Sequence, residues 1–158
     1  MMVKYNEYSL QQSNKQMDTL KNTFEFDIVF KNGIRFNKDF MAIYAMPLHD
    51  FLFYLRKKRQ YNRKIESNLL LGFSISKKVA KACKRNLLRR RIKSIMRRMV
   101  KLSANYVFVF VCRKGVIDYD FNMLSKHIAY SIKRLTQQRA KAHDNKQEFA
   151  RQNLFSKK

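Results

Sequence analysis

The alternation of apolar and polar residues is clearest between residues 77 and 101. Apolar side chains recur there with the spacing of one helical face, about 3.6 residues per turn; they are Leu88, Ile92, Ile95, Met96 and Met99. Polar and basic side chains recur on a different face; they are Asn86, Arg89, Arg90, Lys93 and Arg97. The segment contains no Pro or Gly, and its Ala, Leu, Met, Lys and Arg residues favour helices. The pattern therefore predicts an amphipathic basic helix, which Ser76 can cap.

Four apolar segments predict strands. Three of them precede the basic helix and are rich in aromatic and branched residues: Phe36–Met46, Phe51–Leu55 and Leu69–Ile75. A turn at Pro47 separates the first two. The fourth, Asn105–Cys112, follows the basic helix and is apolar at nearly every position. That composition is typical of a central strand, buried on both faces of a sheet.

The segment Leu20–Phe30 predicts a first helix, capped by Asn22 or Thr23. Phe26 and Phe30 are four residues apart and therefore lie on one side of this helix. Aromatic residues at helical spacing usually belong to a core. The alternative is a platform at the edge of a cleft, on which unpaired bases stack.

The last predicted helix begins near residue 120, with Asp118 or Asp120 as its cap. Its core stripe consists of Phe121, Leu124, Ile128, Ile132 and Leu135. Residues 136–158 are expected to form a polar and basic tail, either a frayed helix or disordered. A flexible tail is also expected at residues 1–16, so that residues 17–135 form a single domain.

The elements follow one another as helix, three strands, basic helix, strand and helix. A helix that joins two strands is typical of a sheet packed against helices. The sequence therefore predicts an α+β fold, a two-layer sandwich with a four-stranded sheet, in which the basic helix is the crossover between strands.

The charge of the chain points to a polyanionic partner. With 35 Lys and Arg against 11 Asp and Glu, the formal net charge is +24, and no acid occurs between residues 67 and 117. A helix face that is only exposed to solvent usually carries both positive and negative side chains, because like charges at i, i+4 repel each other. A nucleic acid supplies the missing counterions. The run Arg56–Lys64 carries six basic residues in nine, and a charged loop and an RNA contact explain it equally well.

Several other classes of protein fit the sequence poorly. The apolar runs are far shorter than the roughly 20 residues of a membrane-spanning helix, and the N-terminal segment lacks the apolar core of a signal peptide. Cys83 and Cys112 have no metal-ligand spacing and are predicted to be buried free thiols. These features predict a cytoplasmic protein.

Residues for autonomous catalysis are missing from the sequence. His49, His127 and His143 are scattered, without the neighbouring Cys, Asp or Glu residues of a metal site. The pair Asp118 and Asp120 beside a helix start is typical of capping. The chain is therefore not expected to cleave a substrate by itself.

The basic helix resembles the signature of the bacterial ribonuclease P protein subunit. The residues that carry the resemblance are Val79-x-x-Ala82-x-x-Arg85-Asn86-Leu87-Leu88-Arg89-Arg90-x-Ile92-Lys93. Three flanking segments are similar to the first helix, the strand-to-helix join and the last strand of that family: residues 20–33, 72–86 and 105–114. The resemblance covers about residues 18–135.

This resemblance implies an auxiliary subunit of an endoribonuclease. In the family a large RNA is the catalyst, which removes the 5′ leader from precursor tRNA, and the protein binds both RNAs and broadens the range of substrates. Magnesium ions held mainly by the RNA supply the hydrolytic chemistry. We expect one protein per ribonuclease P RNA, no organic cofactor and no catalytic residue in this chain. The main alternative is a basic ribosomal-type RNA-binding protein without a role in cleavage.

The resemblance and the charge pattern together suggest two groups of site residues. Those expected to bind RNA are Lys77, Lys78, Arg85, Asn86, Arg89, Arg90, Lys93 and Arg97. Those expected to line a cleft for the leader are Phe26, Phe30 and Tyr44. Leu87 departs from the family pattern, because its position is usually basic, and Arg91 is a candidate substitute.

Overall fold

A five-stranded mixed sheet forms the centre of the computed structural model, which describes residues 17–58 and 64–156, with side chains as far as residue 138. The strands are β1 (Met17–Thr19), β2 (Ile34–Lys38), β3 (Met41–Pro47), β4 (Leu69–Ile75) and β5 (Tyr106–Cys112). Their spatial order is β1-β4-β5-β3-β2. β4 runs parallel to β1 and β5, and β3 runs antiparallel to β5 and β2.

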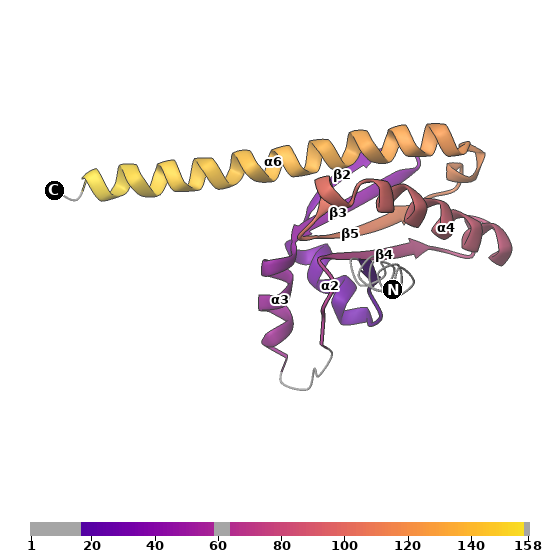
Figure 1. The fold of residues 1–158 in the computed structure, drawn as a ribbon, viewed down its shortest axis with the longest axis horizontal. Coiled ribbons are helices and arrows are strands. Elements are labelled where there is room, and N and C mark those ends of the chain that lie inside the picture. Colours follow the sequence, from indigo (N-terminus) through magenta and orange to yellow (C-terminus); the bar gives the residue numbers. More distant parts are fainter. Residues whose placement is uncertain (1–16, 59–63, 157–158) are drawn as a thin grey trace, which may run out of the picture.

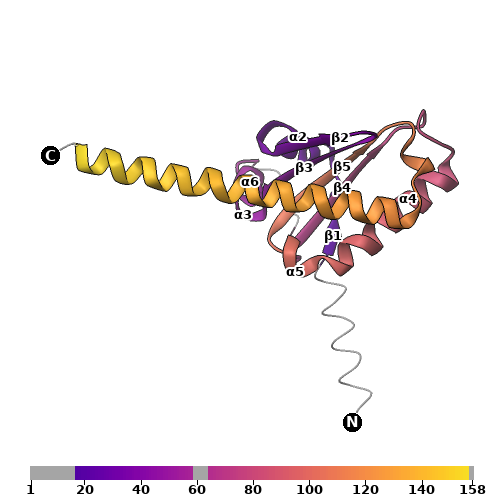
Figure 2. The ribbon, with the colours of Figure 1, turned by 90° about the horizontal axis from the view of Figure 1, so that it is seen from above.

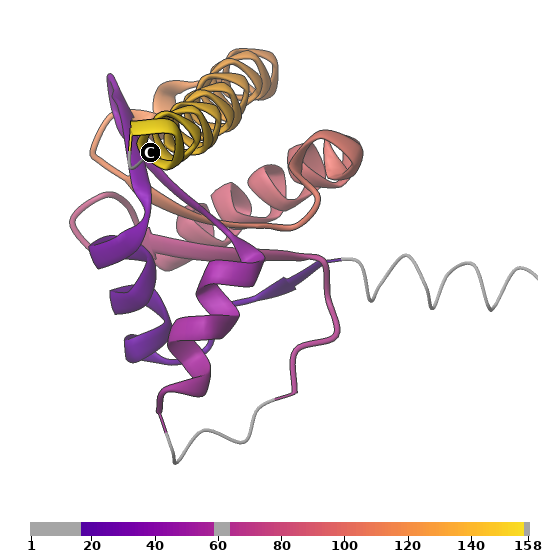
Figure 3. The same ribbon diagram turned by 90° about the vertical axis from the view of Figure 1, so that its left-hand side faces the viewer.

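Helices cover both faces of this sheet (Figures 1 and 3). They are α2 (Thr23–Asn32), α3 (Leu48–Arg56), α4 (Ala82–Arg98), α5 (Val100–Ser103) and α6 (Phe121–Ser156), with a 3₁₀ turn η1 at Val116–Asp118. α4 lies in the connection from β4 to the neighbouring parallel strand β5. The predicted α+β class and the crossover role of the basic helix are therefore confirmed. The sheet has five strands instead of four, and a second helical layer covers the face that the two-layer prediction left open.

The strand β5 is the central strand that its composition predicts, and its alternating side chains divide the core in two. Phe108 and Phe110 point towards α4 and α6, whereas Val107 and Val109 point towards α2 and α3. All four are fully buried. Alternation along a strand sends successive side chains to opposite faces, so an apolar residue is required at every position of a strand that is covered on both sides.

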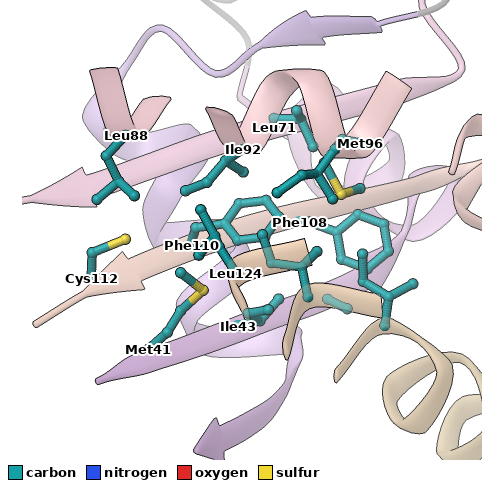
Figure 4. Packing of buried hydrophobic residues seen from close by; sticks show 14 of the residues in the cluster. Met41, Ile43, Leu71, Leu88, Ile92, Met96, Phe108, Phe110, Cys112 and Leu124 are labelled. Atoms are coloured by element: carbon teal, nitrogen blue, oxygen red, sulfur yellow. The ribbon is translucent and has the colours of Figure 1, made fainter. Parts of the chain in front are cut away.

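The first core lies under α4 and α6. Figure 4 shows Leu88, Ile92 and Met96 of α4 directed towards the rings of Phe108 and Phe110. The described part of α6 contributes the predicted stripe, of which Leu124, Ile128, Ile132 and Leu135 are buried and Phe121 is half-buried. Seen from above, α6 crosses the strands and continues beyond the sheet to Ser156 (Figure 2). Residues 136–156 are therefore a helical continuation of α6.

The second core lies under α2 and α3, and its helix α2 is fixed at the N-terminus by a buried acid. Asn22 occupies the N-cap position, which leaves Thr23 as the first helical residue. Glu25 is fully buried and accepts hydrogen bonds from the Lys21 backbone N–H (3.1 Å) and the Asn22 side-chain amide (3.4 Å). A carboxylate at this position also interacts favourably with the helix dipole.

Two strand predictions in the N-terminal half are wrong. The segment predicted as one strand, Phe36–Met46, is a hairpin of β2 and β3, because Asp39 adopts a left-handed conformation (φ 53°) and reverses the chain. The segment Phe51–Leu55 is part of helix α3. Its buried residues Phe51 and Leu55 share a helical face, and a short apolar run does not distinguish a strand from a buried helix.

Among the other elements, one strand was not predicted, the start of the basic helix differs from the prediction, and the start of the last helix agrees with it. The edge strand β1 was missed, since its three residues become a strand only by pairing with β4. α4 begins at Ala82, after a turn in which the Val79 N–H donates to the Ser76 carbonyl, so Ser76 is not its cap. At α6, Asp120 is the cap: its Oδ1 accepts a hydrogen bond of 2.7 Å from the Met123 N–H.

Candidate nucleic-acid interface

The predicted RNA-binding side chains form one basic ridge on α4 and the turn before it. Because Leu88, Ile92 and Met96 of α4 face the sheet, the polar face of the helix is directed outward. Its exposed members are Asn86, Arg90 and Arg97, and its half-buried members are Arg85, Arg89 and Lys93. Lys77 and Lys78 are exposed in the turn that follows β4. The structure thus brings all eight residues to one side of the molecule.

Contacts within the ridge hold some of its side chains in place. Arg89 Nη1 donates a hydrogen bond of 2.8 Å to the side-chain oxygen of Asn86. Lys93 Nζ lies 5.9 Å from the centroid of the Phe73 ring on β4. The Nε atom of Arg85 is buried and has no hydrogen-bond partner. Arg89 still has free donors, and the planar guanidinium fork matches the geometry of a phosphate.

A buried thiol lies beneath the ridge. Burial raises the pKa of Cys112 to about 12, and the positive charge of Arg89 opposes this rise. Cys112 is therefore a neutral, apolar part of the core, as predicted. Cys83, in contrast, is exposed near the start of α4, so the prediction that it is buried is wrong. It lies on a part of α4 that extends past the sheet core, which begins at Leu88.

The three residues predicted to line a cleft also lie together, and they form an aromatic cluster on the opposite face of the sheet. The ring centroids of Phe26 and Phe30 are 6.3 Å apart, and those of Phe30 and Tyr44 are 4.9 Å apart. Phe30 is 38% exposed, while Phe26 and Tyr44 are half-buried. The aromatic cluster, defined as Phe26, Phe30 and Tyr44, therefore serves partly as core and partly as surface.

Phe26 takes part in a close contact with β4. A Cβ atom added at Gly72 would lie 2.8 Å from the ring of Phe26 and 2.8 Å from the side chain of Leu20. The absence of a side chain at Gly72 thus lets α2 approach the sheet. This contact supports the hypothesis that Phe26 belongs to the core. The exposed ring of Phe30 is consistent with the other hypothesis, a platform on which unpaired bases stack.

A cation beside the aromatic cluster was missed by the sequence analysis. Arg35 of β2 lies directly opposite Tyr44 of β3 in the hairpin, and its guanidinium carbon is 5.8 Å from the centroid of the Tyr44 ring. The residue was overlooked because β2 and β3 were read as one strand. Asp39, a residue type that tolerates a left-handed turn, was the signal that would have revealed this pairing.

The potential metal ligands of the chain, its histidines among them, lie apart from one another in the part of the chain that the structure describes. Within residues 17–58 and 64–138, no three His, Cys, Asp or Glu side chains are close enough together to hold a metal ion. His49 is exposed on α3 and His127 is buried in α6, and His143 lies where side chains are not described. None of the helices described is both long and apolar enough to cross a membrane.

The comparisons with known proteins agree with the motif on α4. The family model for ribonuclease P matches residues 15–136. The chain belongs to this family. The ribonuclease P protein component of Helicobacter acinonychis is 36% identical over 120 residues, 72% of this chain and 75% of that protein. The corresponding protein of Desulforamulus reducens is 30% identical over 125 residues, 78% of this chain and 96% of that protein.

Solved structures of ribonuclease P proteins share the fold. The protein from Staphylococcus aureus aligns with a TM-score of 0.57 at 18% identity, covering 73% of this chain and 92% of that chain. The protein from Thermotoga maritima aligns with a TM-score of 0.56 at 20% identity, covering 73% and 96%. The sheet with its basic crossover helix is thus a ribonuclease P protein fold.

Leu87, the residue that departs from the ribonuclease P motif, has cations on both sides along α4. It is 44% exposed and lines a shallow pocket of about 210 Å³ between α4 and η1. Lys84 and Arg91, three residues before it and four after, line the same pocket. Residues at these spacings are neighbours on a helix surface, so the positive charge that Leu87 lacks is present one turn away in either direction.

Proposed function

We propose that this chain is the protein subunit of a ribonuclease P holoenzyme, in which the basic ridge binds the catalytic RNA and the aromatic cluster binds the 5′ leader of precursor tRNA. Its part in removing the leader is to hold the two RNAs together and to broaden the range of accepted substrates. The observation that carries the proposal is the placement of the ridge and the cluster on opposite faces of one sheet. Figure 3 shows the helices that carry them, α4 on one face and α2 on the other.

This placement suits a protein that binds two RNAs at once. All members of the ridge except Asn86 are cations, and they lie on the polar side of α4 and in the turn before it. Guanidinium groups bind phosphates without regard to sequence. The aromatic cluster offers the face of an exposed ring, Phe30, with the cation Arg35 nearby. Stacking on such a ring requires unpaired bases, and a leader is single-stranded.

The net charge explains why a protein without catalytic residues would assist such a reaction. Catalytic RNA and precursor tRNA are both polyanions, so each repels the other. A protein of net charge +24 reduces this repulsion and lowers the concentration of salt that the complex needs. In this proposal the magnesium ions are held mainly by the RNA of the holoenzyme. An RNA complex of this kind is expected in the cytoplasm.

The proposal is tested by reconstituting cleavage. The purified chain is mixed with its cognate ribonuclease P RNA and a precursor tRNA at a magnesium concentration too low for the RNA alone. We expect cleavage at the mature 5′ end only when both protein and RNA are present. Tight binding to the RNA without any effect on cleavage would instead support the ribosomal-type alternative.

Two pairs of substitutions distinguish an effect of the ridge from an effect of the overall net charge. Arg89→Ala with Arg90→Ala removes two cations of the ridge, and Lys126→Ala with Lys133→Ala removes two exposed cations from α6. Both pairs lower the net charge equally. Only the ridge pair is expected to raise the protein concentration needed for cleavage. Equal effects of the two pairs would mean that net charge, and not the ridge, supports the reaction.

A further inference from the structure

A second group of aromatic and basic side chains lies at the C-terminal end of α3. Phe53 is 55% exposed, and the ring of Tyr54 meets it edge to face with centroids 5.6 Å apart. Lys57 Nζ lies 4.6 Å from the centroid of the Phe53 ring and 5.7 Å from that of Tyr54. Lys58 Nζ lies 4.6 Å from the ring of Phe24 on α2. These five residues are named the α3 surface below.

The α3 surface is separate from the aromatic cluster. Phe24 and Phe26 are two residues apart on α2, which places them about 200° apart around the helix axis. Ile28 and Val29, which lie between these directions, are buried against the sheet. α2 therefore stands between the two groups, with Phe26 and Phe30 on the side of the cluster and Phe24 on the side of α3.

The composition of the α3 surface favours a polyanion that carries aromatic groups. The exposed ring of Phe53 is in contact with the half-buried ring of Tyr54, so the two form a pair of rings at the surface and not a single exposed side chain. The cores of protein–protein interfaces are depleted of Lys, whereas here Arg56, Lys57 and Lys58 are consecutive and exposed. Rings combined with cations are the features that hold single-stranded nucleic acid, because bases stack on the rings while cations neutralise the phosphates.

We propose that the α3 surface binds unpaired nucleotides of RNA, with a base stacked on Phe53 and phosphates close to Lys57 and Lys58. The proposal deepens the proposed function and rests on it for the identity of the RNA. The unpaired nucleotides belong either to the leader of the precursor or to a single-stranded part of the catalytic RNA. The two sources share one chemistry, and the experiment distinguishes them.

The experiment measures RNA affinity of the full chain with two matched pairs of variants. Phe53→Leu removes the ring and keeps an apolar side chain, whereas Phe53→Tyr keeps the ring. Lys57→Ala removes a cation of the α3 surface, whereas Lys64→Ala removes a cation that pairs with Glu66 at 3.7 Å outside it. Thermal unfolding of each variant reports whether the fold is intact, which we expect because Phe53 is largely exposed.

Three RNAs serve as probes: an unstructured oligonucleotide, the catalytic RNA, and precursor tRNA bound to the holoenzyme with a long or a truncated leader. Phe53→Leu is expected to weaken binding of the oligonucleotide by about 5- to 150-fold, the range for loss of one stacked base, and Phe53→Tyr is expected to preserve it. Lys57→Ala is expected to weaken binding more than Lys64→Ala.

The other two probes identify the source of the nucleotides. A loss that appears only with the long leader assigns the α3 surface to the leader, and a loss that appears with the catalytic RNA alone assigns it to that RNA. Parental affinity of Phe53→Leu for all three RNAs, or equal losses in Lys57→Ala and Lys64→Ala, would overturn the proposal. Because affinity for the oligonucleotide needs no cleavage, this result is independent of whether the chain stimulates the reaction.

Discussion

The rings of Phe30 and Tyr44 meet edge to face, with their centroids 4.9 Å apart and their planes inclined at 78°. Phe30 is exposed in the last turn of α2, and Tyr44 lies on β3 opposite Arg35 and Val109. Such aromatic pairs contribute about 0.5–1.5 kcal/mol beyond the area that they bury. This contact therefore helps to hold α2 against β3 at the place where the leader is proposed to bind.

Replacing the two rings singly and together should reveal both their coupling and their role in binding. In a double-mutant cycle of Phe30→Ala and Tyr44→Ala, we expect a coupling of about 0.5–1.5 kcal/mol in the free energy of unfolding. Each variant should also weaken leader binding by about 1–3 kcal/mol, the range for loss of a stacked base. Phe40→Ala is the control, because its ring is similarly exposed (43%) but lies at the hairpin turn. Its leader affinity should equal that of the parent protein.

Phe26 should show separable contributions to packing and to binding. Its ring contacts the space that a side chain at Gly72 would occupy, so Phe26→Ala is expected to lower the free energy of unfolding by about 1–3 kcal/mol. Phe26→Leu keeps most of the apolar volume, and its free energy of unfolding should change less. If the ring stacks on bases, both variants lose leader affinity. Parental leader affinity in Phe26→Leu would show that this residue belongs to the core alone.

The salt dependence of RNA binding should show directly whether residues of the ridge contact phosphates. Each phosphate contact contributes about 0.7–0.9 to the slope of log affinity against log salt concentration. Arg89→Ala with Arg90→Ala should therefore flatten this slope by about 1.4–1.8 if both residues contact phosphates. The measurement is a series of dissociation constants for the catalytic RNA at increasing salt. An unchanged slope would place the RNA on another face of the protein.

His127 should make the stability of the fold depend on pH. Its Nε2 lies 3.1 Å from the Lys38 carbonyl oxygen, to which it donates, and its buried Nδ1 has no partner. Burial lowers the pKa of His127 below 6.5, although the hydrogen bond to Lys38 opposes the shift. The unfolded chain therefore binds more protons just below pH 6.5. The contribution of neutral His127 to the free energy of unfolding is therefore complete above pH 6.5, and it is lost as the pH falls towards the lowered pKa.

The check for His127 compares free energies of unfolding at about pH 7.5 and about pH 5.5. The parent protein is expected to be less stable at the lower pH, and His127→Gln should lose part of this difference. His49→Gln, which changes an exposed histidine of α3, should keep it. An equal pH dependence in His127→Gln and the parent would contradict the assignment.

The two cysteines should differ sharply in reactivity. Cys83 is exposed, whereas Cys112 is buried and burial raises its pKa to about 12. Because only the thiolate reacts, alkylation of the native protein at about pH 8 should modify Cys83 alone. Mass spectrometry of the digested protein identifies the site. Cys83→Ser should remain unmodified until the protein is unfolded, and rapid labelling of Cys112 in the native state would contradict its burial.

The strongest features of the chain were readable from sequence because each depends on neighbouring residues alone. The apolar stripe of Leu88, Ile92 and Met96 predicted the buried face of α4, and the structure buries all three. The continuous apolar run of β5 likewise predicted a central strand. Local periodicity and the absence of acids determine these features before any tertiary contact forms. The ridge residues were therefore identified correctly as one surface, and their binding role remains a prediction.

Other features were decided by contacts between segments that are distant in sequence. The three residues of β1 form a strand because β4 offers them a parallel edge, and the apolar run around Phe51 is a helix because its buried side fits the face of the sheet below it. The position of Arg35 beside Tyr44 likewise depends on the hairpin register. Local sequence fixes which side of a segment is apolar, but the pairing partners and the shape of the core choose between helix and strand.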